Sequence, residues 1–84
     1  MTALLLFPSI HYVLRAEKVL QRKGVAGGLV PVPHDVSTEC GMAWSMPEEE
    51  ISTALQALEG AGLRPDAAWT KTEAGWERLN LDRA

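Results

Sequence analysis

The order of apolar segments along the chain is the feature that most narrows the choice of fold. Residues 3–7 form a continuous apolar run of strand length, which predicts a buried strand. Residues 10–23 then carry apolar residues at helical spacing, with Ser9 as the expected N-cap and Gly24 as the expected stop. The apolar face of this helix is expected to consist of Ile10, Val13, Leu14, Ala16 and Leu20.

Two further strands are predicted between residues 27 and 45. Residues 27–33 read as a strand that ends in a Pro-x-Pro sequence. Pro31 and Pro33 each remove a backbone donor, so this strand is expected at the edge of a sheet. Residues 41–45 are short and mostly apolar, which predicts the next strand, and a polar loop of residues 34–39 separates the two.

A second helix and a fourth strand complete the predicted fold. Pro47 followed by three glutamates is typical of a helix start, and apolar residues recur at helical spacing as far as Leu58. Residues 66–71 predict the fourth strand. The order β-α-β-β-α-β favours an α+β, ferredoxin-like fold: a four-stranded antiparallel sheet with two helices on one face. Residues 1–74 are expected to form this single domain, and residues 75–84 a C-terminal tail, either a short docking helix or a frayed end.

Composition and charge narrow the class of protein further. The chain has 84 residues, which suffices for one domain with one modest core. Its 8 basic and 11 acidic residues give a net charge of −3, which argues against nucleic acid as a partner, since nucleic-acid binding needs basic patches. A single cysteine cannot form an internal disulfide, so a cytoplasmic location is expected. No apolar segment is long enough for a membrane span, so no membrane partner is expected.

Cys40 is the only cysteine of the chain, and it lies in a polar segment closed by Gly41. A free cysteine is more often an inert core residue, but the neighbours of this one favour turns and the surface. In a ferredoxin-like sheet, the loop before Gly41 lies at the same end as Pro8 and Ser9. Cys40 is therefore expected near the N-terminus of the first helix, where a thiolate is stabilised and the pKa of a thiol is lowered. Both readings, core residue and reactive thiol, stay open at this point.

Several residues near that position are candidates for binding or polarising a thiolate. They are Gly41, Ser9, His11, His34 and Ser37. A histidine there could support the thiolate as a cation or pass on a proton, and a serine hydroxyl could donate a hydrogen bond. Each also has a plain reading as a turn, cap or solvated surface residue. No Cys-x-x-Cys or His-x-x-x-His spacing occurs, so no metal site is predicted.

Some of these segments also form a recognisable pattern. The pattern consists of Phe7-Pro8-Ser9, Leu14-x-Ala16-Glu17-Lys18-x-Leu20, Pro31-x-Pro33, Ser37 and Cys40-Gly41. With it, the chain resembles a small family of bacterial and archaeal domains described as selenium/sulfur carrier-like proteins. The resemblance covers about residues 3–72, and the Pro-x-Pro…Ser-x-x-Cys-Gly element is its most specific part. The family usually has a basic residue, often arginine, after the second proline, where this chain has His34.

This resemblance implies a carrier rather than an autonomous enzyme. Cys40 would hold a sulfur or selenium atom as a persulfide or perselenide and hand it to an acceptor protein, with no cofactor besides this covalent cargo. The expected partners are sulfur or selenium donor and acceptor proteins, and a homodimer is also open. The alternative is a ligand-sensing or protein-interaction module in which Cys40 is incidental. No acid–base pair or nucleophile–base spacing in the sequence calls for an enzyme.

Overall fold

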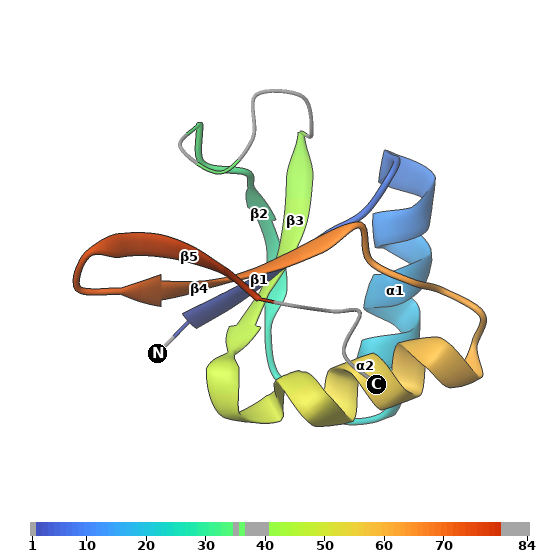
Figure 1. Cartoon of the computed structure of the whole chain (residues 1–84). Helices are drawn as coiled ribbons and strands as arrows, with labels where there is room; N and C mark the ends of the chain where they lie inside the picture. Colours follow the sequence, from blue (N-terminus) through green and yellow to red (C-terminus); the bar gives the residue numbers. More distant parts are fainter. Residues whose placement is uncertain (1, 35, 37–40, 80–84) are drawn as a thin grey trace.

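The structural elements follow the order that the sequence predicts, with one strand added at the end (Figure 1). This computed structural model describes residues 2–34, 36 and 41–79. The elements are β1 (Thr2–Leu6), α1 (Ile10–Arg22), β2 (Gly28–Pro31), β3 (Met42–Pro47), the 3-10 helix η1 (Glu48–Glu50), α2 (Ile51–Gly60), β4 (Ala67–Thr72) and β5 (Gly75–Leu79). Most boundaries differ from the predicted ones by one to three residues, which is the usual uncertainty at element ends.

The strands form one antiparallel sheet in the order β2-β3-β1-β4-β5. β1 lies at the centre, between β3 and β4. β1 and β2 are both antiparallel to β3, so they run in the same direction. The first four strands and the two helices therefore have the ferredoxin-like arrangement. β2 lies at an edge of the sheet, as its prolines predict.

The prediction of four strands is wrong, because part of the expected tail forms a fifth. β5 pairs with β4 along its whole length. The Thr72 hydroxyl donates to the Gly75 carbonyl oxygen at 2.9 Å and accepts from the Ala74 N–H at 3.2 Å. Gly75 has φ +122°, a conformation that favours glycine. The segment between the strands lacks the Asn-Gly or Asp-Gly pair that marks a tight hairpin, so the sequence alone gives no signal for it. Residues 80–84 of the expected tail lie outside the described residues.

Both helices pack on one face of the sheet and bury the main core there (Figure 1). Leu5 of β1 and Trp44 of β3 oppose each other in the sheet and meet Leu20 of α1 and Leu58 of α2 in this cluster. The remaining buried members are Ala3, Phe7, Val13, Ala16, Val25, Met46, Ala54, Leu63 and Ala68. Trp44 is fully buried and is the largest side chain in the core.

The other face of the sheet carries a smaller apolar cluster. Its buried members are Leu4, Leu6, Val32 and Ala43, with the partly buried Val30, Val36, Ala67, Trp69 and Trp76 packed against them. β1 thus buries side chains on both of its faces. This explains why its sequence is a continuous apolar run rather than an alternating one.

Helix α1 begins and ends where the sequence predicts. Ser9 has an extended backbone, and its hydroxyl accepts a hydrogen bond from the Tyr12 N–H at 3.5 Å. Gly24 follows the helix with φ +75°, and the Val25 N–H donates to the Leu20 carbonyl oxygen, which closes the last turn. Neither of the two helices that the structure describes is long and apolar enough to cross a membrane.

The buried face of α1 is narrower than predicted. Val13, Ala16 and Leu20 are buried, but Ile10 and Leu14 are 48% and 42% exposed. At about 100° per residue, Ile10 and Leu14 point roughly 90° and 130° away from the middle of the buried stripe. Their spacing fits an apolar face, but only the narrower stripe reaches the sheet.

Candidate functional site

Two segments that carry predicted site residues start from the same end of the sheet, where β1 and β2 finish. β1 and β2 run in the same direction, so their C-terminal ends lie at the same edge. β1 leads into α1, and β2 leads into the connection that ends at Gly41. Figure 1 shows the first turn of α1 and the adjoining ends of β2 and β3 toward the same side of the molecule. We call this end of the sheet the loop edge, to be distinguished from the outer strands. Leu6 and Pro31, which end β1 and β2, and Met42, which starts β3, lie there.

The described part of the β2–β3 connection is fixed to the sheet by backbone hydrogen bonds. The Val32 N–H donates to the Gly41 carbonyl oxygen at 3.3 Å, which extends the β2–β3 ladder beyond the strands. The Val36 N–H donates to the Pro33 carbonyl oxygen at 3.0 Å, which forms a turn. Val32 is buried, and both valines belong to the apolar cluster on the face away from the helices. The base of the connection is therefore anchored by packing as well as by hydrogen bonds.

Four of the predicted site residues lie at the loop edge. Ser9 and His11 start α1, and His34 and Gly41 lie in the connection; all four are exposed. Between described residues, no hydrogen bond or ion pair joins the side chains of Ser9, His11 and His34 to one another. Cys40 and Ser37 lie outside the described residues, so their part in the site stays a prediction.

The electrostatics at the start of α1 suit an anion. The first N–H groups of a helix have no partner within the helix, and the helix dipole adds about half a positive charge at this end. The Ser9 hydroxyl takes up the Tyr12 N–H, and the first turn contains no acidic residue. A thiolate or persulfide close to this end would therefore meet favourable rather than repulsive charge.

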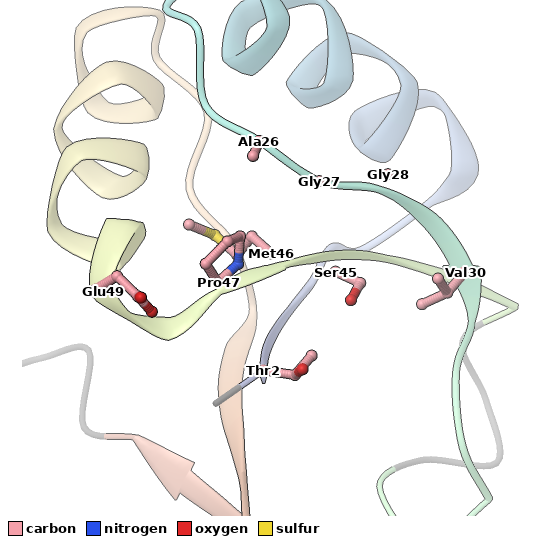
Figure 2. Close-up of a pocket in the computed structure, with 9 residues that line it drawn as sticks. All are labelled: Thr2, Ala26, Gly27, Gly28, Val30, Ser45, Met46, Pro47 and Glu49. Atoms are coloured by element: carbon pink, nitrogen blue, oxygen red, sulfur yellow. The ribbon is translucent and has the colours of Figure 1, made fainter.

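A depression of about 480 Å³ lies at the other end of the strands from the loop edge (Figure 2). It is lined by Thr2, Ala26, Gly27, Gly28, Val30, Ser45, Met46, Pro47 and Glu49. Figure 2 shows Thr2, Val30 and Ser45 on the side of the strands away from the helices. Gly28, which has no side chain, opposes Ser45, which has a small one, in the β2–β3 pairing, so little fills the surface at this point.

The chemistry of this depression does not match a transfer site. Its side chains include hydroxyls and the Glu49 carboxylate, but no cysteine or histidine. Among the described residues, no group of three or more His, Cys, Asp or Glu is placed to hold a metal ion. The loop edge is therefore the stronger candidate, since the nucleophile and histidines predicted from the sequence belong to its two segments.

One feature of the loop edge differs from what the sequence predicts. Periodicity places Ile10 and Leu14 in the core, yet they form an apolar surface at the start of α1. The sequence does contain a signal that Leu14 is exposed. Arg15 follows Leu14 directly and Lys18 follows it by one turn, which is typical of the outward face of a helix.

A comparison with protein-family models shows which family the chain belongs to. A family model described as "Putative Se/S carrier protein-like" matches residues 2–70. The chain belongs to this family. The match extends from β1 into β4 and includes both segments of the loop edge, whereas β5 lies outside it. The resemblance predicted from the sequence is thus confirmed at the level of the family. The comparisons with curated proteins and with solved structures found no match.

Proposed function

We propose that the protein carries a sulfur or selenium atom on Cys40, as a persulfide or perselenide, between a donor and an acceptor protein. One observation carries the proposal: the chain matches the Se/S carrier-like family over residues 2–70, and its only cysteine falls inside that match. The family name supplies the class of cargo. The chain supplies one thiol that can hold it.

The chemistry of loading is an exchange between a thiol and a persulfide. The Cys40 thiolate attacks the outer sulfur of a donor persulfide, R–S–SH. The donor S–S bond breaks, R–S⁻ leaves and takes up the proton that Cys40 gave up, and the products are Cys40–S–SH and R–SH without net oxidation. Delivery to the acceptor thiol is the same step with Cys40–S–SH as the donor. A second cysteine nearby would displace the cargo by forming a disulfide, and this chain has no second cysteine.

The surroundings of the loop edge support this role. Gly41, which follows Cys40 in the chain, is exposed, and the positive end of α1 lies at the same edge. We assign the Gly41 N–H and the start of α1 to stabilising the anion, and the hydroxyl of Ser37 to a hydrogen bond to it. His11 and His34 are exposed and have the right chemistry to exchange protons with the thiol.

The experiment is a loading assay read by intact mass. The protein is incubated with a cysteine desulfurase and either L-cysteine or L-selenocysteine, so that the transferred sulfur or selenium arrives at the oxidation level of a persulfide or perselenide and no oxidant is needed. The wild type should gain the mass of one sulfur or one selenium atom, and a thiol reductant should remove it. Cys40→Ser should gain nothing. A wild type that stays unmodified, or a Cys40→Ser variant that gains the same mass, contradicts the proposal.

A further inference from the structure

The large apolar side chains that the described residues leave exposed are gathered at the start of α1. Ile10, Tyr12 and Leu14 are 48%, 41% and 42% exposed, and no other large apolar side chain among the described residues is exposed in this way. Single exposed apolar residues are common on protein surfaces. Three lie within five residues at the edge where the proposed carrier thiol belongs, and those that form one contiguous surface call for a functional explanation.

Two of these side chains share one side of the helix. Ile10 and Leu14 are one turn apart, so they point within about 40° of each other. Tyr12 points about 160° away from both, on the other flank of the buried stripe of α1. Ile10 and Leu14 therefore form one continuous apolar surface, and Tyr12 does not belong to it.

Basic residues continue this surface along the helix. Lys18 lies one turn after Leu14 on the same side of the helix. Arg15 and Arg22 lie beside Lys18, and all three basic residues are exposed. Within the described part of the chain, none of the three makes an ion pair. α1 holds these three basic residues and one acid, whereas the chain as a whole has a net charge of −3. We call the surface formed by Ile10, Leu14, Arg15, Lys18 and Arg22 the α1 outer patch.

We propose that the α1 outer patch is the docking surface for the sulfur donor, a protein whose surface beside its own persulfide is acidic and has an apolar centre. The inference rests on the proposed function, because sulfur transfer requires the donor to reach the loop edge, where α1 begins. Leu14 and Ile10 supply apolar area for the contact, and the unpaired cations attract an acidic rim and orient it.

The test compares two sulfur sources, one that must dock on the protein and one that need not. An effect on docking can then be told from an effect on the reactivity of Cys40. The cysteine desulfurase of the source organism, with L-cysteine, loads Cys40 through protein contact, whereas inorganic polysulfide needs no docking surface. Leu14→Glu places an acid in the patch at an exposed position, so the fold should be kept, which circular dichroism checks. We expect desulfurase-dependent loading to become roughly tenfold slower or more, with the polysulfide rate unchanged. Added salt should slow desulfurase-dependent loading of the wild type and leave polysulfide loading nearly unchanged.

Tyr12→Glu is the matched control, since Tyr12 is equally exposed in the same turn but lies on the other flank. Its desulfurase-dependent rate should stay within about twofold of the wild type if docking is confined to the patch. Leu14→Glu loading as fast as wild type, or Tyr12→Glu losing as much, overturns the docking inference and leaves the carrier function intact. A polysulfide rate that falls in Leu14→Glu, or a wild type that only polysulfide loads, also overturns it. A wild type that neither source loads sinks the carrier function itself.

A control with lipid vesicles tests whether the α1 outer patch binds a membrane instead of a donor protein. Vesicles of anionic phospholipid are mixed with the wild type and with Leu14→Glu, and co-sedimentation is measured. We expect neither to bind. Binding by the wild type that Leu14→Glu abolishes, with unchanged desulfurase-dependent loading, would assign the patch to a membrane surface and overturn the inference.

Discussion

At the scale of single residues, two adjacent glycines before β2 have different roles. Gly27 has φ +143°, and a Cβ at this position would collide with the Ser45 carbonyl oxygen and lie 3.0 Å from the Trp44 ring. A Cβ at Gly28 would meet no such neighbour within 4 Å, and Gly28 has no unusual φ. Gly27 therefore lets the backbone pass close over the fully buried Trp44, whereas Gly28 only leaves room in the surface depression.

This difference predicts a measurable contrast in stability. Gly27→Ala should lower the free energy of unfolding by about 2 kcal/mol or more, because it combines a forbidden φ with a backbone collision. Gly28→Ala should change it by less than about 1 kcal/mol. Urea unfolding followed by tryptophan fluorescence measures both. Equal effects of the two substitutions would show that the close approach at Gly27 contributes little.

At the scale of elements, α1 shows what sequence reasoning captures and what it misses. Its cap at Ser9 and its stop at Gly24 depend on local chemistry, so both are predictable. The width of its buried face depends on how the helix sits on the sheet, which periodicity does not contain. Periodicity therefore places Ile10 and Leu14 in the core, although the sheet leaves them exposed. The same limit applies to β5, whose pairing depends on Gly75 and the Thr72 hydroxyl rather than on a recognisable turn sequence.

The cap of α1 also separates a structural role of Ser9 from a chemical one. Ser9→Ala removes the acceptor for the Tyr12 N–H and should lower stability by about 0.5–1 kcal/mol. Ser9→Asp restores an acceptor, so its stability should equal or exceed that of the wild type. The added carboxylate near a thiol should raise the pKa of that thiol, so polysulfide loading at neutral pH should slow in Ser9→Asp. Unchanged stability in Ser9→Ala would contradict the capping role, and unchanged loading in Ser9→Asp would place the thiol away from this end of α1.

At the scale of the whole molecule, the topology explains why a site can be proposed from so few residues. Once β1 and β2 run in the same direction, the start of α1 and the β2–β3 connection must share an edge. This consequence follows from the ferredoxin-like fold that the order of elements favours, so the location of the candidate site is predictable once that fold is assumed. The arrangement of side chains within it is not, because spacing along the chain does not fix how Ser9, His11 and His34 lie relative to one another.

The same topology separates β5 from the proposed function. β5 pairs only with β4, at the opposite edge of the sheet from β2, and it lies outside the family match, which ends at residue 70. A chain that ends at Thr72 should therefore still fold and load Cys40 within about twofold of the full-length rate, since β1 to β4 and both helices remain. It should be less stable, because Leu79 packs against the main core and Trp76 against the smaller cluster.

Urea unfolding and the polysulfide loading rate test this separation together. Full-length Trp76→Ala is the companion variant: it removes packing by β5 without exposing the edge of β4, and it should be less destabilised than the shortened chain. If the shortened chain does not fold, the companion variant still tests the separation through its loading rate. Slow loading in a folded variant that lacks this packing would mean that β5 supports the thiol across the sheet. The fifth strand would then belong to the carrier site rather than only to the stability of the fold.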